Sequence, residues 1–555
     1  MKMQYLSALD ASFLHMETPE MPMHVGGMNL FELPRGFDGD FYEVVKRHVQ
    51  QRLHLAPIFT RKLALMPFEL ANPVWIEDDA LDLDYHVRKI VLPKPGSLAQ
   101  LQAYVGRLHS SLLDRSRPLW EFYIFEGLEN GQAAFYSKIH HAALDGQGAA
   151  ALAQVLLDIS PVPRDVPPPL LKRKQAYQPS VSELLSAAAQ DAWRQSVQIA
   201  KTLPQGVKAA GALLKHAWEA RGQEHAKTGV GFAPRTPLNV SVTNQRLFAT
   251  ASLPFNEVRA IAKAFEVSVN DVVLATCSGA LRAWLARHAA LPSRSLLTAM
   301  PVSLRQEGNT DLNNQVSMMR MHLASNIADP VKRLQRIHAH AKTLKKTLGS
   351  VKSVLPTNLP SIGLPWLMTG LTSFYARSRL ADRMSPLANL VISNVPGPQM
   401  DLYLAGAKML SNFPVSIVAH GMGLNITVQS YAGKLDIGMI ACRRAMPDLA
   451  DFAEMMTEAH AELLAAAKAV VASDVGEKPA SEGKARRRAA AKAVKPAGAE
   501  KAAKPVKPAK SAKAKQTEAV ADASAPAKPK RTPRARKALQ TPQDGHTEEP
   551  GRTAD

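Results

Sequence analysis

The sequence predicts an α/β protein with mixed sheets, in which two regions that combine helices and strands are followed by a disordered tail. Residues 1–160 alternate helical and strand-like hydrophobic patterns, and residues 237–470 show the same mixture. The composition, with 46% apolar and 21% charged residues, is typical of a globular protein with a sizeable core. At 555 residues the chain is long enough for two or three folding units.

The first region, residues 1–160, carries clear signals for its elements. Ser97 to Gln100 forms a capping-box pattern ahead of a helix with one apolar face. The apolar run Phe122–Phe125 and the segment Ala133–Ile139 predict two strands, joined by a turn at Glu129–Gly131. A helix with one buried face is expected next, because apolar residues recur at helical spacing from Leu152 to Ile159.

Residues 161–236 are expected to link the two regions. Five prolines between Pro161 and Pro169 end the first region, and a basic, helical segment then begins at a capping box formed by Ser180 and Glu183. Its apolar stripe either packs between the two regions, which we favour, or rests on a membrane surface.

The second region, residues 237–470, is expected to contain a helix over Val272–Leu285 and a hairpin over Leu424–Cys442 that turns at Ala432–Gly433. A last helix starts at Pro447. Its inward-facing residues are predicted to be Leu449, Phe452, Met455 or Met456, and Leu463.

The tail, residues 471–555, holds much of the positive charge. From Val475 to Asp555 it has 20 Lys and Arg against 9 Asp and Glu, which is more than half of the formal net charge of +20. It repeats Ala, Lys and Pro and lacks aromatic residues, so it cannot bury enough apolar surface to fold. Such a segment either binds polyanions or only improves solubility.

The cellular setting is expected to be cytoplasmic. Cys277 and Cys442 lie far apart and outside any metal-ligand spacing, which favours a reducing compartment and no metal site. No apolar signal segment follows Met1, and no run of about 18 apolar residues predicts a membrane span. A peripheral position at the inner membrane or at lipid inclusions fits these features.

The run His140-His141-Ala-Ala-Leu-Asp145-Gly146 carries the chemistry. The two histidines end a predicted strand, where successive side chains point to opposite faces, so one of them faces a given cleft. A histidine can remove a proton from a hydroxyl near pH 7 if its tautomer is fixed and donors stabilise the oxyanion that forms. The alternatives are zinc binding, which diverging neighbours on a strand do not favour, and simple packing of both rings.

This run matches the His-His-x-x-x-Asp-Gly signature of the chloramphenicol-acetyltransferase-like superfamily, which includes peptide-synthetase condensation domains. Further blocks, in family order across about residues 5–465, resemble the bacterial wax ester synthase/diacylglycerol acyltransferase family. The blocks are Leu9–Phe13, Pro22–Gly26, Arg117–Glu121, Asn270–Val272, Pro301–Arg305, Asn314–Ser317, Ser393–Pro398 and Gly423–Thr427.

The resemblance implies two similar chloramphenicol-acetyltransferase-like domains with the histidine run in a channel between them. It implies that acyl-CoA enters one side as co-substrate, with no other cofactor, and that diacylglycerol or a fatty alcohol enters the other. His141 would deprotonate the acceptor hydroxyl, which attacks the thioester directly and yields triacylglycerol or a wax ester. His140 and Gly146 shape the same turn.

Asp145 lacks a serine placed for a triad, and in the superfamily this aspartate holds its loop through an arginine. Arg305 is the partner that we expect for it. Asn270 either supports the acyl channel and oxyanion or caps the helix that follows, and we favour the cap.

Three more residues belong to the matching blocks. Trp120 is expected to pack in the core near the channel, and Ser303 is assigned to the channel. Asn394 is expected at a strand end near the domain interface.

Other readings of the chain stay open. One is a related enzyme that uses a carrier-bound donor, and another is a non-catalytic protein of lipid granules or the nucleoid that acts through its basic tail. The apolar segment Leu355–Tyr375, broken by Pro and Gly, predicts either a membrane-contacting lid or an irregular core loop.

Overall fold

The computed structural model describes most of the chain up to residue 476. The described residues are 4–64, 72–144, 148–168, 180–186, 189, 190, 193, 197, 231–303, 316–351, 369, 370, 372, 374, 375 and 377–476. The chain divides into two units, Met1–Pro479 and Ala480–Asp555, and all described residues belong to the first. Asp145, Gly146, Arg305, the basic tail and most of the predicted lid therefore lie outside the described residues.

The first large sheet has six strands and carries the histidine run. Its strands, from edge to edge, are β12 (Tyr403–Leu404), β13 (Ala407–Val415), β2 (His24–Glu32), β7 (Ala133–His140), β6 (Trp120–Glu126) and β5 (Val87–Val91). Neighbours are antiparallel except β5, which runs parallel to β6. Helices α2 (Phe41–Arg52) and α5 (Gly148–Leu156) cover one face.

The second large sheet also has six strands. Their order is β10 (Val316–His322), β9 (Leu297–Ser303), β11 (Leu390–Val395), β14 (Leu424–Tyr431), β15 (Lys434–Cys442) and β8 (Arg246–Pro254). Strand β11 runs parallel to both of its neighbours, and the other pairs are antiparallel. The helices that share its core are α7 (Phe255–Ala264), α8 (Val269–Arg287), α9 (Pro330–Val351) and α11 (Leu449–Gly476).

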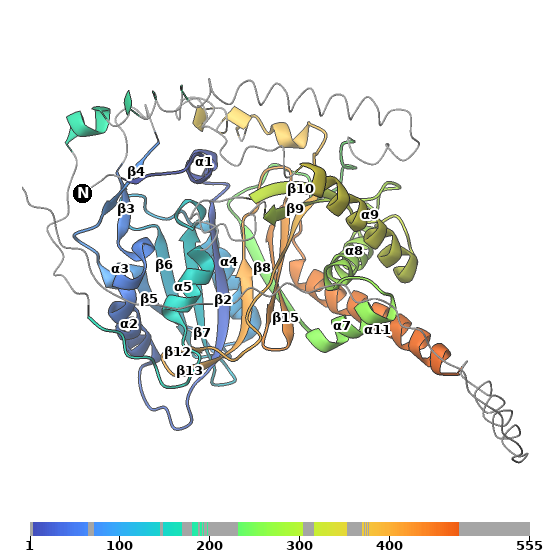
Figure 1. Ribbon diagram of the computed structural model, residues 1–555, viewed down its shortest axis with the longest axis horizontal. Coiled ribbons are helices and arrows are strands. Elements are labelled where there is room, and N and C mark those ends of the chain that lie inside the picture. Colours follow the sequence, from blue (N-terminus) through green and yellow to red (C-terminus); the bar gives the residue numbers. More distant parts are fainter. Residues whose placement is uncertain are drawn as a thin grey trace, which may run out of the picture. The chain divides into compact units, whose positions relative to one another are not determined.

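Helix α4 (Leu98–Ser110) lies between the two large sheets (Figure 1). It begins at the predicted capping box, in which Ser97 and Gln100 bond reciprocally. Leu101 packs in a cluster that contains residues of both sheets. Gln102 Nε2 donates to Thr250 Oγ1 on β8 at 2.9 Å. The amphipathic helix predicted here thus has two partners, one on each side.

Strands β12 and β13 cross from the second half of the chain into the first sheet, where β13 pairs with β2 (Figure 1). The prediction that all of residues 237–470 form one domain is therefore wrong for β12 and β13, which belong to the first large sheet. The crossing also joins the sheets, because the Asn412 backbone N–H donates to Asp436 Oδ2 on β15 at 2.7 Å. A Cβ on Gly438 would lie 1.7 Å from the Pro414 carbonyl oxygen, so the two strands approach as closely as glycine allows.

A small third sheet contains β1 (Gln4–Tyr5), β4 (Val74–Glu77) and β3 (Arg61–Ala64). The remaining short elements are α1 (Ala8–Met16), α3 (Leu83–His86) and the 3-10 turns η1 (Leu53–Leu55), η2 (Pro57–Phe59), η4 (His141–Ala143) and η7 (Leu380–Asp382). Helix α1 packs beside η4, which brings the N-terminal segment to the histidine run.

Several sequence predictions are confirmed. The hairpin β14–β15 turns at Ala432 and Gly433, both with positive φ. The predicted last helix is present, but it begins at Leu449, two residues after the expected start at Pro447. The side chains predicted to face inward on this helix are all buried: Leu449, Phe452, Met455, Met456 and Leu463.

The prediction of one helix through Ile159 is wrong. Helix α5 ends at Leu156, and Ile159 is 76% exposed. The chain leaves the helix because Asp158 bridges the backbone of Tyr403 and pairs with the buried Arg52 at 3.2 Å. The apolar spacing simply continues past the last helical residue.

Within the described part of the chain, no single helix is long and apolar enough to cross a membrane. One pair, α7 and α8, passes that test only together, across a bend of 101°.

Candidate active site

The histidine run lies where β7 ends. His140 is the last residue of β7 and pairs with His24 of β2 in the sheet register. His141 opens the 3-10 turn η4, and its backbone N–H donates to the Met23 carbonyl oxygen at 2.8 Å. The chain turns out of the strand at this point, so the two rings have different surroundings: His140 is fully buried and His141 is partly exposed.

His140 is held by two contacts that fix its tautomer. Its Nδ1 accepts the backbone N–H of Ala142 at 3.1 Å, and the proton therefore resides on Nε2. Nε2 lies 3.3 Å from Glu17 Oε1. A ring that accepts on one nitrogen and faces a carboxylate with the other has one orientation, which makes His140 a fixed support for the turn.

Glu17 is buried and ionised beneath the histidine run. Arg115 pairs with its Oε2 at 2.8 Å, and the Met23 N–H donates to its Oε1 at 3.0 Å. Burial raises the pKa of this carboxyl, but His140, Arg115 and the Met23 N–H together outweigh burial and lower the pKa to about 2. Sequence reasoning missed Glu17, since no spacing rule relates position 17 to position 140.

The His141 ring stacks on Phe13 of α1, with ring centroids 3.9 Å apart and an interplanar angle of 16°. Its Nδ1 is buried and has no hydrogen-bond partner among the described residues. Burial lowers the pKa of His141 to about 4, so the imidazole is neutral at pH 7. A neutral, partly exposed imidazole has a lone pair available to accept a proton.

A second pair of buried histidines lies beside this site. His24 Nε2 is 2.7 Å from the carbonyl oxygen of His109 on α4. His109 in turn contacts Tyr136 Oη at 2.7 Å and the Ser416 carbonyl oxygen at 2.9 Å. Burial lowers the pKa of both rings, to about 3 for His109, so both are neutral. They connect β2, α4 and the segment after β13 through hydrogen bonds.

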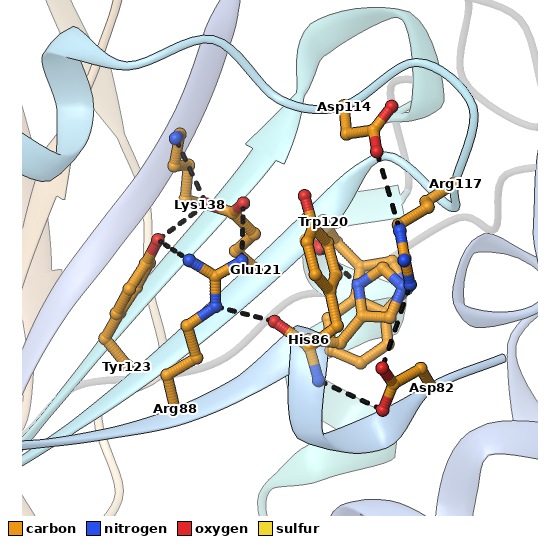
Figure 2. Close-up of polar contacts among 10 residues, drawn as sticks. Asp82, His86, Arg88, Asp114, Arg117, Trp120, Glu121, Tyr123 and Lys138 are labelled. Atoms are coloured by element: carbon orange, nitrogen blue, oxygen red, sulfur yellow. Dashed lines mark hydrogen bonds and ion pairs between the residues drawn. The ribbon is translucent and has the colours of Figure 1, made fainter.

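A buried ionic cluster lies on β6 and β7, as Figure 2 shows. Lys138 Nζ lies 3.2 Å from Glu121 Oε2, and both side chains are almost fully buried. Tyr123 Oη donates to the same carboxylate at 2.7 Å, and Arg88 pairs with its other oxygen at 3.3 Å. Burial lowers the pKa of Lys138 and raises that of Tyr123. Lys138, Tyr123 and Arg88 thus all contact the Glu121 carboxylate. These contacts hold β7, the strand that ends at His140.

Trp120 is a core residue, as predicted. Its ring is fully buried and stacks on His86 at 4.3 Å between centroids, as Figure 2 shows. Its Nε1–H donates to the Phe59 carbonyl oxygen at 3.2 Å. These contacts leave its polar atom satisfied inside the protein.

The candidates from the second half are only partly brought together. Asn394 Nδ2 donates to Asn270 Oδ1 at 3.2 Å, which links β11 to the start of α8. Ser303 is the last residue of β9, whose neighbour in the sheet is β11. Asp145, Gly146 and Arg305 lie outside the described residues, so their pairing stays a prediction.

The expectation that Asn270 caps a helix is wrong. Helix α8 begins one residue before it, at Val269, and Ser268 is the N-cap. Ser268 and Asp271 form a capping box, and Asp271 also pairs with His338 at 2.8 Å. The Asn270 side chain is thus free of the capping role and engages Asn394.

The fold and the site together define an α/β protein, built on two large mixed sheets, whose candidate chemistry is proton transfer by a histidine. Two family models match the chain. The catalytic domain of wax ester synthase/diacylglycerol acyltransferase matches residues 6–273, and the C-terminal domain of the same family matches residues 312–464.

Similar proteins agree with these matches. A probable diacylglycerol O-acyltransferase of Mycobacterium tuberculosis is 36% identical over 449 residues, which cover 79% of this chain and 94% of the relative. The O-acyltransferase WSD of Acinetobacter baylyi is 34% identical over 451 residues, covering 80% and 93%. The structure of a wax ester synthase/diacylglycerol acyltransferase from Marinobacter aquaeolei VT8 superposes with a TM-score of 0.59 at 31% identity, covering 84% of this chain and 100% of that one.

The chain belongs to the wax ester synthase/diacylglycerol acyltransferase family and is an O-acyltransferase. The family membership and the mixed α/β fold predicted from the sequence are both confirmed.

Proposed function

We propose that the protein transfers a fatty acyl group from acyl-CoA to diacylglycerol or a long-chain alcohol, with His141 as general base. The observation that carries this proposal is the neutral His141 imidazole, which is partly exposed at the end of β7 and held flat against Phe13. The family supplies the substrates, since its relatives are named for acyl transfer to diacylglycerol and for wax ester synthesis.

In the proposed reaction, His141 Nε2 accepts the proton of the acceptor hydroxyl while the hydroxyl oxygen attacks the thioester carbonyl carbon. Nε2 is the nitrogen assigned to this step because Nδ1 is buried. The tetrahedral oxyanion then collapses, the carbon–sulfur bond breaks, and the imidazolium returns its proton to the departing thiolate. The products are an ester and free CoA. General-base assistance typically contributes about 10²–10⁴-fold, and positioning and oxyanion stabilisation must supply the rest.

The surrounding residues would act by positioning. Glu17 and His140 fix the turn that carries His141, and Phe13 fixes the plane of its ring. The contact between Asn270 and Asn394 would support the acyl chain or the oxyanion from the second sheet. Asp145 and Arg305 would hold the loop that follows the histidines.

The test is ester formation from palmitoyl-CoA. The purified protein is mixed with hexadecanol or dioleoylglycerol, and the lipid products are separated and quantified. Hexadecyl palmitate or triacylglycerol should form in step with CoA release, and the preferred acceptor decides between a wax ester synthase and a diacylglycerol acyltransferase. Ester formation only from a palmitoyl-carrier protein would refute acyl-CoA as the donor.

We also propose that the protein works peripherally at the inner membrane or at lipid inclusions, where such acceptors reside. The positive charge of residues 475–555 supports a polyanionic partner for the tail. Truncation after Pro479 should keep ester formation and weaken binding to anionic surfaces. Loss of ester formation by a folded truncated protein would instead assign the activity to the tail.

A further inference from the structure

Two chain segments join into one surface on the second half of the protein. Residues 231–235 run along residues 377–387, and the Ala233 N–H donates to the Pro386 carbonyl oxygen at 2.8 Å. The Arg235 guanidinium donates to three carbonyl oxygens of the second segment. Arg320 on β10 donates to the Gly231 carbonyl oxygen at 3.2 Å, so the surface continues onto the edge strand of the sheet.

This surface exposes large apolar side chains. Phe232 is 56% exposed, Met384 55% and Leu387 66%, and Phe374, just before the second segment, is 64% exposed. Met318 lies two residues before Arg320, on the same face of β10, and is 53% exposed. Single exposed apolar residues are ordinary, but a group of this kind marks a surface with a partner.

The same segments carry a concentration of positive charge. Their exposed basic residues are Arg235, Arg377, Arg379 and Arg383, and Arg294 reaches the Phe232 carbonyl oxygen at 3.5 Å. Asp382 is the acidic residue of the two segments. Its carboxylate already accepts the Ser241 N–H at 2.7 Å and pairs with Arg444 at 3.3 Å. It therefore does not neutralise the exposed arginines of the two segments.

We propose that this arginine-apolar surface, residues 231–235 and 377–387 with Phe374 and Met318, docks the protein on an anionic lipid surface. The apolar side chains would enter the boundary between headgroups and acyl chains, while the guanidinium groups bind lipid phosphates at headgroup level. Arginine suits this role because its planar fork binds phosphate oxygens in pairs. A membrane is chosen because the exposed charge on this surface has one sign, which matches anionic lipid headgroups. Protein interfaces also favour Phe, Met and Arg, so vesicle binding that does not use this surface would assign it to a protein partner instead.

Docking deepens the peripheral position proposed above, and its use, the capture of a lipid acceptor at the membrane, rests on the proposed acyl transfer.

The experiment is cosedimentation of the full-length chain with vesicles of phosphatidylcholine, with and without phosphatidylglycerol. Arg379→Ala/Arg383→Ala should weaken binding to the anionic vesicles by about fivefold for each charge and leave the neutral ones unchanged. Met384→Ser/Leu387→Ser should weaken binding to both vesicle types on the order of tenfold. The basic tail is present in every variant, so it contributes equally throughout.

Matched controls use exposed residues on the first sheet and its helices. Val91→Ser, at a side chain 61% exposed, and Arg47→Ala, at an exposed arginine of α2, should bind like the wild type. Thermal unfolding checks that each variant is folded. If the double variant Met384→Ser/Leu387→Ser is not folded, Phe232→Ser is tested in its place.

Binding by both double variants that equals the wild type on both vesicle types would overturn the proposal and assign membrane binding to the tail. His141→Ala should bind vesicles normally. Ester formation should therefore be lost in His141→Ala, whereas docking should be lost in the surface variants.

Discussion

Replacement of Glu17 by glutamine removes the negative charge beneath His140 and keeps the shape of the side chain. The carboxyl has a pKa of about 2 in the folded protein against 4.5 for an unperturbed glutamate. At 1.36 kcal/mol per pKa unit this difference corresponds to about 3 kcal/mol of folding free energy. Because the side chain is only 2% exposed, solvent screens its interactions weakly. A lowered carboxyl pKa stabilises the fold above pH 4.5, and this contribution is lost as the pH falls toward 2.

Urea unfolding of Glu17→Gln and wild type at pH 7 and at pH 3 measures this contribution. The variant should be less stable by about 3 kcal/mol at pH 7. The difference should shrink at pH 3, because the carboxyl of the unfolded chain is already protonated below pH 4.5 while the folded one keeps its charge until near pH 2. The matched control is Asp451→Asn, which breaks an exposed pair with Arg287 and should cost less than about 1 kcal/mol. A deficit that stays the same at both pH values would refute the charged contact between Glu17 and its partners.

Three further outcomes are expected. The pH profile of kcat/KM should fall on the acid side near pH 4, because protonation of His141 removes the base; an acid limb near pH 6.5 would contradict the buried, neutral ring. Gly438→Ala should lower stability by about 3 kcal/mol in thermal unfolding, because a Cβ there overlaps β13, whereas Gly231→Ala, with open space around it, should not; equal melting temperatures would refute the close strand contact. Lys138→Met should cost about 3 kcal/mol by leaving Glu121 short of a partner, and the double variant with Glu121→Gln should cost less than the two changes added; strict additivity would show that the two groups do not interact.

The sequence predicted the elements of the site better than their assembly. The strand before His140 follows from its hydrophobic pattern, and the start of α4 follows from a capping box; both signals act within a few residues. The capping box that begins α8 was also readable, since Ser268 and Asp271 have the required spacing, and it rules out Asn270 as the cap.

Contacts between residues far apart in the sequence could not be predicted from such local patterns. No strand is predicted from the sequence over residues 407–415, and nothing local shows that this segment leaves its neighbours in sequence to pair with β2. Glu17 reaches His140 only because α1 packs against η4. Its burial, and hence its lowered pKa, depends on elements more than a hundred residues away.

The general-base role of His141 is tested by acceptor-dependent CoA release from palmitoyl-CoA, measured for wild type and His141→Ala, with His54→Ala as a control at an exposed histidine. Removal of His141 should lower the acceptor-dependent rate by about 10²–10⁴-fold, while the fold and the rate of the control variant stay unchanged. Acceptor-dependent release by a folded His141→Ala variant at the wild-type rate would contradict the assignment of His141 as the general base.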